Sequence, residues 1–342
     1  MDEQTLKATA AALTADAKGL LAMDESVPTA NKRFAALGIA QTPEMRRAYR
    51  DMIVTAPGLA GSISGAILHD ETIRSTTLAD VPFAQALQRT GIIPGIKVDG
   101  GTKALALHEG ELVTDGLDGL RERLAEYSTM GARFAKWRAV ITIDDAGNTP
   151  SRGCIEANAH ALARYAALCQ EAGIVPIVEP EVLMDGAHTL ARCAEATERT
   201  LHVVFHALRA QRVLLEGVLL KPNMVVPGLK CPAQASAGEV ADATIAAFRR
   251  VVPAAVGGIA FLSGGQSAQD ASARLNAMHV RHVDLPWPLA FSFARAIQDP
   301  AMKAWAGRKE NVASAQKALV ERAHFNRLAR RGEYTAGLET PR

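Results

Sequence analysis

Eight short apolar segments recur along the 342-residue chain, with longer stretches of helical periodicity between them. Most of them carry a glycine or proline near one end, and continuous apolar segments of this kind are typical of strands buried on both faces. They lie at residues 19–24, 64–70, 91–98, 132–140, 174–180, 216–222, 256–263 and 288–293. Eight parallel strands are the number that closes into a barrel, so the pattern favours an α/β fold of the (β/α)8 TIM-barrel type over a doubly wound open sheet.

The stretches between these segments have the spacing of amphipathic helices. In residues 153–172, for example, Ile155, Ala159 and Leu162 fall at intervals of four and three and form one apolar face. Thr42 followed by Pro43 predicts a capped helix start. Further helices are predicted at residues 118–130, 188–211, 239–252, 267–279 and 309–331.

The length of the chain fits one barrel with insertions, since such barrels have about 250 residues, but it would also fit two ordinary domains. No change of composition marks a boundary, and the Pro- and Gly-containing stretches at 55–62 and 225–238 read as loops. We therefore expect a single domain over residues 1–342, with residues 333–342 as a short C-terminal tail.

Composition limits the partners of this domain. The formal net charge is +2, which offers no bulk electrostatic basis for binding nucleic acid or a membrane surface. No apolar segment approaches the length of a membrane span, and the N-terminus lacks the apolar core of a secretory signal. The four cysteines form no CxxC pair, so we expect reduced thiols and a cytoplasmic protein.

Charged and hydroxyl residues stand at the C-terminal ends of nearly all the predicted strands, where a barrel builds its active site. Each could be a solvated strand end or a structural ion pair, but their recurrence on successive strands favours a functional mouth. Lys136 and Arg138 are two apart, so their side chains point the same way. The full set is Asp24, Lys97, Lys136, Arg138, Glu179, Lys221, Ser263, Ser292 and Arg295.

Lys221 is the most informative of these residues, because it follows the apolar segment GVLL and precedes Pro222. Burial and a neighbouring cation, for which Lys136 is the candidate, disfavour an ammonium ion. A neutral amine attacks carbonyl carbons, and the protonated imine that results is an electron sink. Glu179, Glu181 and Asp24 are the candidate proton shuttles, and the residues alone do not say which carboxylate is the acid and which the base.

Phosphate groups have two candidate sites. The segment LSGGQS at 262–267 predicts a glycine turn at Gly264 and Gly265, and the backbone N–H groups of such turns bind phosphate. Arg295 fits the phosphate site that barrels often build after strands seven and eight. Four residues that follow the first strand could hold a second phosphate near Lys97, namely Ser26, Thr29, Lys32 and Arg33. His202 and His206 have the i, i+4 spacing of metal ligands but no third ligand, so we expect helix packing there and neither a metal nor another cofactor.

The chain resembles the class I fructose-bisphosphate aldolases along almost all its length. The matching segments are KGLLAMDES (18–26), GIKVDGG (95–101), GLDGLRER (116–123), FAKWR (134–138), GIVPIVEPEVLMDG (173–186), LEGVLLKPNMVVPG (215–228), FLSGGQS (261–267) and KENVASAQ (309–316).

The resemblance implies reversible cleavage of fructose 1,6-bisphosphate, a step of glycolysis and gluconeogenesis, through a Schiff base on Lys221. Glu179 would be the main acid and base, Asp24 would accept the C4 hydroxyl proton, and Lys136 would stabilise the carbinolamine. It implies contacts with the C1 phosphate from Ser263, Gly264, Ser292 and Arg295, and contacts with the remaining chain and the C6 phosphate from Lys97, Arg33, Ser26 and Arg138. The implied partners are a small phosphorylated sugar and copies of the same chain in a homotetramer.

The sequence departs from the family pattern at three places. Pro28 and Thr29 stand where glycine and serine are usual, which touches the C6-phosphate end. Ala294 replaces a usual glycine beside Arg295. The chain also ends soon after Tyr334, whereas the animal enzymes have a longer tail that ends in a tyrosine. We therefore expect enamine proton exchange to depend less on the tail.

Three other functions compete with this one. The same chemistry could act on fructose 1-phosphate, sedoheptulose 1,7-bisphosphate or another ketose phosphate. A catalytically inactive scaffold of this fold would have no need for Lys221, Glu179, Asp24 and Lys136 together. A metal-dependent aldolase would need a histidine cluster at the strand ends, which the sequence does not contain.

Overall fold

The computed structural model describes residues 2–144 and 148–339, and a closed barrel of eight parallel strands forms its centre. The strand order around the barrel is β1-β10-β9-β8-β7-β6-β3-β2. Each of the eight predicted segments overlaps one barrel strand, which confirms the (β/α)8 fold. The strands are β1 Gly19–Ala22, β2 Ile63–Leu68, β3 Ile93–Lys97, β6 Phe134–Ile141, β7 Val175–Val182, β8 Leu219–Leu220, β9 Gly258–Phe261 and β10 Leu289–Phe293.

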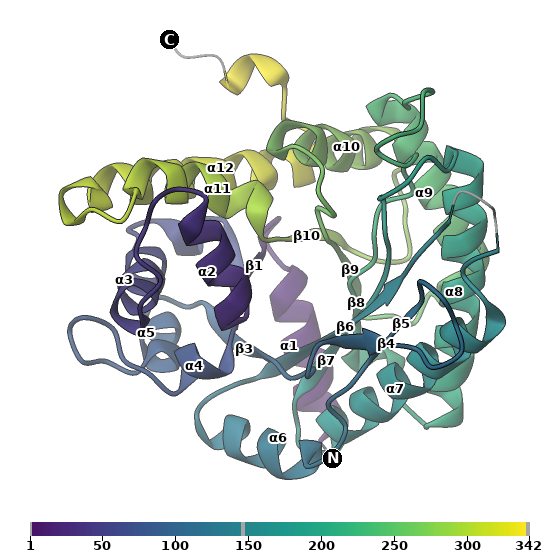
Figure 1. Ribbon diagram of the computed structural model, residues 1–342, viewed down its shortest axis with the longest axis horizontal. Coiled ribbons are helices and arrows are strands. Elements are labelled where there is room, and N and C mark those ends of the chain that lie inside the picture. Colours follow the sequence, from purple (N-terminus) through teal and green to yellow (C-terminus); the bar gives the residue numbers. More distant parts are fainter. Residues whose placement is uncertain (1, 145–147, 340–342) are drawn as a thin grey trace.

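Helices surround the barrel, as Figure 1 shows. Every helix predicted above is present, and the Thr42 side chain accepts a hydrogen bond from Met45 N at the start of the helix that begins at Pro43. The helices are α2 Val27–Ala35, α3 Pro43–Val54, α4 Asp70–Ile73, α5 Phe83–Arg89, α6 Leu120–Thr129, α7 Arg152–Glu171, α8 Leu190–Ala210, α9 Ala237–Val251, α10 Ala268–Arg281, α11 Arg295–Trp305 and α12 Val312–Arg330, with short 3-10 turns at Leu59–Gly61, Leu215–Gly217 and Lys309–Asn311.

One further helix, α1 (Glu3–Thr14), closes the floor of the barrel and was not foreseen from the sequence. In Figure 1 it lies at the centre of the ring of elements. Leu6, Ala10 and Leu13 are fully buried and pack against side chains that fill the barrel interior. Ser64 Oγ, near the start of β2, donates a hydrogen bond of 2.6 Å to Leu13 O. Because α1 covers the end where the strands begin, the opposite end is left as the mouth.

A small antiparallel hairpin also escaped the sequence analysis. Its strands are β4 (Thr102–Ala104) and β5 (Leu112–Thr114), and they follow β3. All three residues of β4 are exposed. An exposed strand of three residues has too few alternations to stand out in a sequence.

The end of the chain packs onto the outer helices. A 3-10 turn at Ala336–Glu339 follows α12, and Glu339 pairs with Arg322 of α12. Gln269 of α10 donates a hydrogen bond of 2.8 Å to Glu339 Oε2. In Figure 1 this turn lies beyond α10 and α12. Residues 340–342 of the predicted tail lie outside the described residues.

Two other expectations bear on the described part of the chain. Its four cysteines are all buried and unpaired. None of the helices described in residues 2–144 and 148–339 is long and apolar enough to cross a membrane.

Candidate active site

The C-terminal ends of the barrel strands surround a cleft of about 680 Å³. Its lining brings together twelve of the fourteen site residues predicted from the sequence. These are Asp24, Ser26, Lys97, Lys136, Arg138, Glu179, Glu181, Lys221, Ser263, Gly264, Ser292 and Arg295. Arg33 and Gly265 lie next to the cleft but do not line it.

Neighbouring strands supply the charged groups at the centre of the cleft. Lys136 and Arg138 come from β6, and both side chains face the mouth. Strand β7 is adjacent and parallel to β6, and its residue Glu179 is paired with Arg138. Lys221 directly follows β8, and its backbone N–H donates to Val178 O at 2.8 Å. The pairing of β7 with β6 on one side and with β8 on the other therefore brings residues of all three strands into one site.

Glu179 connects the two lysines of this centre. Its Oε1 lies 3.1 Å from Lys221 Nζ, and its Oε2 lies 3.3 Å from Lys136 Nζ. All three residues are about 3% exposed. A carboxylate held between two buried amines can move a proton to or from either of them.

Lys136 has two further acidic neighbours. Its Nζ lies 2.7 Å from Asp24 Oδ2 and 4.0 Å from Asp99 Oδ2. Burial alone would lower the pKa of Lys136, but the charges of Asp24, Glu179 and Asp99 outweigh it and raise that pKa well above its usual range. Lys136 is therefore a fixed cation at neutral pH.

Asp24 shows the complementary effect. Burial alone would raise its pKa, but the charges of Lys136, Lys221 and Lys97 and the hydrogen bond from Lys136 hold that pKa well below its usual range. The carboxylate stays ionised at neutral pH and lies at the mouth just beyond the end of β1. Without substrate, the site thus holds a charged ion pair next to Lys221 and Glu179 at neutral pH.

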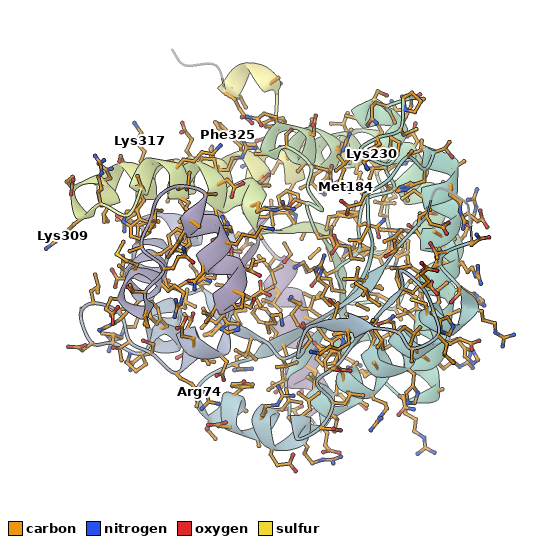
Figure 2. The ribbon with its side chains drawn as sticks, in the orientation of Figure 1. Arg74, Met184, Lys230, Lys309, Lys317 and Phe325 are labelled. Atoms are coloured by element: carbon orange, nitrogen blue, oxygen red, sulfur yellow. The ribbon has the colours of Figure 1, made fainter. Side chains whose placement is uncertain are left out.

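A glycine turn follows β9 on one side of the mouth. Gly264 and Gly265 have φ of +56° and +92°, a left-handed conformation that residues with a Cβ rarely adopt. A Cβ placed on Gly265 would lie 3.6 Å from both Arg295 Nη2 and the sulfur of Met184. Met184 is labelled in Figure 2. The predicted turn and Arg295 therefore lie side by side.

Ser292 adds a polar group to the same wall. It belongs to β10 and is 1% exposed, and its Oγ has no hydrogen-bond partner among the described residues. A buried hydroxyl without a partner has a free energy cost that a bound ligand oxygen would remove. Nearby Ala294 has a negative φ of −103°, so its backbone does not use the left-handed conformation for which glycine is usually needed.

Another part of the cleft wall holds the predicted second set of ligands: Ser26 follows β1, Lys97 ends β3 and Arg138 lies on β6. Lys97 Nζ lies 2.5 Å from Asp99 Oδ1, and Arg138 Nε lies 2.5 Å from Glu181 Oε2. Ser26 Oγ lies 3.0 Å from Thr29 Oγ1 at the start of α2. Here each cation already has a carboxylate partner within the protein.

Arg33 lies behind this wall. It forms ion pairs with Glu25 and with Asp299, the latter at 2.8 Å. Glu25 itself lines the cleft and also pairs with Arg50 at 2.7 Å. Pro28 occupies the first turn of α2, where the missing N–H of proline costs no helical hydrogen bond.

Sequence reasoning missed three ionisable residues of the lining, namely Glu25, His69 and Asp99. Asp99 is the most buried of them, and it also accepts hydrogen bonds of 3.2 Å from the backbone N–H groups of Arg138 and Gly101. Its position two residues after Lys97 is the signal that could have identified it. His69 directly follows β2 and Glu25 lies three residues after the end of β1, and neither has a distinctive motif.

The structure offers no obvious cation site. Within residues 2–144 and 148–339, no three His, Cys, Asp or Glu side chains gather in a way that could hold a metal ion. His202 and His206 are exposed on α8, away from the mouth.

The fold and the cleft together define a class of protein: a (β/α)8-barrel enzyme whose mouth combines a buried lysine, proton-transferring carboxylates and a glycine turn suited to phosphate. The family model described as fructose-bisphosphate aldolase class-I matches residues 5–341. A probable fructose-bisphosphate aldolase class 1 from Xanthomonas axonopodis pv. citri is 55% identical over 98% of this chain and 99% of its own length.

Two other relatives agree. The cytosolic fructose-bisphosphate aldolase 5 of Arabidopsis thaliana is 50% identical over 96% of this chain and 91% of its own. A solved structure of fructose-bisphosphate aldolase from Plasmodium falciparum, in complex with TRAP and an inhibitor, has a TM-score of 0.96 and 46% identity, and covers 98% of this chain and 96% of the solved chain. The chain belongs to the class-I fructose-bisphosphate aldolase family.

Proposed function

We propose that this enzyme cleaves fructose 1,6-bisphosphate reversibly into dihydroxyacetone phosphate and glyceraldehyde 3-phosphate through a Schiff base on Lys221. The observation that carries the proposal is the contact of Glu179 with both Lys221 and Lys136 in a buried cleft. A lysine that forms an imine must first give up its ammonium proton, and a carboxylate at 3.1 Å can accept it.

The first half of the reaction makes the imine. The Lys221 amine adds to the C2 ketone carbon and forms a carbinolamine. Glu179 then protonates the departing hydroxyl, water leaves, and a protonated imine remains. Lys136, a fixed cation, stabilises the developing negative charge on the C2 oxygen during the addition.

The second half breaks the carbon–carbon bond. Asp24 accepts the proton of the C4 hydroxyl, and the electrons of the C3–C4 bond move into the imine to form an enamine. Glyceraldehyde 3-phosphate leaves with C4 as its aldehyde carbon. The enamine takes a proton at C3, and water hydrolyses the resulting imine to release dihydroxyacetone phosphate. Glu181 would assist proton movement from its place beside Glu179 on β7.

The two phosphates would bind two different sets of residues in the cleft lining. The glycine turn, Ser292 and Arg295 would bind the C1 phosphate, because the turn offers backbone N–H groups and Ser292 offers a free hydroxyl. Lys97, Arg138 and Ser26 would bind the C6 end, with Arg33 acting behind them. Since Lys97 and Arg138 are paired with carboxylates, the substrate would have to share or replace these partners.

Borohydride trapping tests the mechanism. Reduction in the presence of dihydroxyacetone phosphate should place one covalent adduct on Lys221, identified by peptide mass analysis. Lys221→Met should lose both the adduct and the cleavage activity, while Lys317→Met, an exposed lysine on α12, should keep both. Cleavage at the normal rate by Lys221→Met would refute the proposal.

We also propose a cytoplasmic location and assembly into homotetramers, as the family resemblance implies. The Arabidopsis thaliana relative is named as cytosolic. Sedimentation of the purified protein tests the assembly, and relative kcat/KM values for fructose 1-phosphate and sedoheptulose 1,7-bisphosphate test the choice of substrate.

A further inference from the structure

His69 lines the cleft, although the mechanism above gives it no role. It follows β2 directly and precedes the short helix α4. Its ring is half-buried, and its neighbours within electrostatic range include Lys97, Arg50 and Asp24. An imidazole in this position can serve one of two roles: it can form a hydrogen bond that stabilises the start of α4, or it can contact the substrate.

The hydrogen bond at Nδ1 determines which ring nitrogen carries the proton. The backbone N–H of Glu71 donates to His69 Nδ1 at 3.3 Å, so Nδ1 must be an acceptor. Burial, with the charges of Lys97 and Arg50, lowers the pKa of His69, which favours the neutral ring near pH 7. A neutral ring that accepts at Nδ1 carries its proton on Nε2.

The Nε2–H group is available for a ligand. Among the described residues no hydrogen-bond acceptor contacts it, whereas Nδ1 is already occupied by Glu71 N. His69 therefore presents one neutral donor in a wall whose other nitrogen donors, Lys97 and Arg138, are paired with carboxylates.

The strand order places this donor opposite the reactive lysine. Around the barrel, β2 lies four strands from β8 in either direction, so the residue after β2 faces Lys221 across the mouth. On either side of β2, β1 leads to Asp24 and β3 carries Lys97. A sugar chain bonded to Lys221 and extended away from the glycine turn would reach this wall with its distal carbons.

We propose that His69 is a specificity-determining residue whose Nε2–H donates a hydrogen bond to an oxygen in the aldehyde-derived half of the substrate. The inference rests on the proposed function, because it takes the imine at Lys221 as the fixed end of the sugar. It predicts that His69 affects the bisphosphate and not dihydroxyacetone phosphate, which lacks the distal carbons.

Two substitutions separate the donor from the backbone support. In His69→Asn, the side-chain oxygen can still accept from Glu71 N, as asparagine does at helix starts, but no donor reaches the position of Nε2. In His69→Gln, the amide N–H₂ reaches the position of Nε2, but the Nδ1 acceptor is lost. Melting temperatures of both variants show whether each is folded.

The assay compares cleavage with trapping. We expect His69→Asn to lose about tenfold in kcat/KM for fructose 1,6-bisphosphate, the size of one lost hydrogen bond to a phosphate or hydroxyl oxygen, while borohydride trapping of dihydroxyacetone phosphate on Lys221 stays unchanged. His69→Gln should recover most of the loss. A similar loss with fructose 1-phosphate would assign the hydroxyl oxygens, and a loss confined to the bisphosphate would assign the C6 phosphate.

The opposite pattern would overturn the inference. If His69→Asn keeps the full kcat/KM while His69→Gln loses it, the residue only supports the start of α4. Equal losses in cleavage and in trapping would also exclude a contact with the distal half. Absence of any Lys221 adduct in the unaltered protein would instead contradict the proposed function, so the two failures are distinguishable.

Discussion

Replacement of Lys136 by methionine should destabilise the folded protein as well as stop catalysis. Lys136 is the sole ion-pair partner of Asp24 among the described residues, at 2.7 Å, and the carboxyl side chain is only 11% exposed. The other two carboxylates near Lys136 keep partners after the substitution, since Glu179 pairs with Lys221 and Asp99 pairs with Lys97. The main consequence is therefore one buried carboxylate without a direct ion-pair partner, with only the more distant charges of Lys221 and Lys97 to compensate it.

The size of the effect follows from that burial. Removing one partner of a buried ion pair costs about 3–5 kcal/mol, because the remaining charge stays out of water without compensation. The free energy of unfolding of a domain is about 5–15 kcal/mol. Lys136→Met should therefore remove a large part of it and clearly lower the urea concentration at the midpoint of unfolding. Adding Asp24→Asn should recover about 1–3 kcal/mol, because the orphaned charge is removed as well.

The pH dependence has a defined sign. The lowered pKa of Asp24 contributes stability above its unfolded value, near 4, and the raised pKa of Lys136 contributes stability below about 10.4. Between these limits the unaltered protein keeps both contributions. In Lys136→Met, burial pushes the pKa of Asp24 upward, so the deficit in the free energy of unfolding should shrink as the pH falls from 8 to 5.

Urea unfolding at pH 8 and pH 5 measures both the loss in the free energy of unfolding and its pH dependence. Lys317→Met is the control for loss of an exposed lysine. A loss below about 1 kcal/mol for Lys136→Met at pH 8 would refute the reasoning, since that is the range of a surface pair. A double variant no more stable than the single one would show that Asp24 is not the group left unpaired.

Three further predictions concern the barrel and the tail. Gly95→Ala would place a Cβ 2.2 Å from the Phe134 ring, so it should cost about 1–3 kcal/mol, whereas Gly61→Ala meets nothing within 4 Å and should have little effect; thermal unfolding of both compares them directly. Leu13→Ala would open a cavity in the fully buried floor of the barrel and should cost about 2–5 kcal/mol by urea unfolding, and a loss under 1 kcal/mol would contradict the role of α1 as a floor. Removal of residues 333–342 should lower the melting temperature but keep turnover near that of the full chain, and a large loss of turnover would show that proton exchange needs the tail.

Much of the fold could be predicted because each strand and most helices show a recognisable pattern within their own residues. Eight buried strands appear as eight apolar segments, and each predicted helix shows its own periodicity or cap. The helix α1 escaped because its apolar face packs into the barrel, and nothing in residues 3–14 says which surface will cover it. The hairpin β4–β5 escaped because its strands are too short and too exposed to form a pattern.

The candidate site also contains residues that the sequence predicted and residues that it did not. Lys136, Glu179 and Lys221 were predicted because a charged residue within or just after an apolar strand segment is conspicuous in the sequence alone. His69 also directly follows β2. It was not predicted, because a histidine after a strand is as typical of an ordinary loop as of a functional site.

The sequence by itself determined the number of barrel strands, their parallel direction and which strands carry chemistry. It could do so because burial on both faces and the positions of charged residues can be recognised in each segment separately. Only the tertiary structure determined which charged side chains form ion pairs. Glu179 contacts Lys136 and Lys221, which lie 43 and 42 positions from it along the chain. Arg33 forms an ion pair with Asp299, far away in the sequence. Such pairings depend on the register and closure of the barrel, which set distances between segments that no local pattern records.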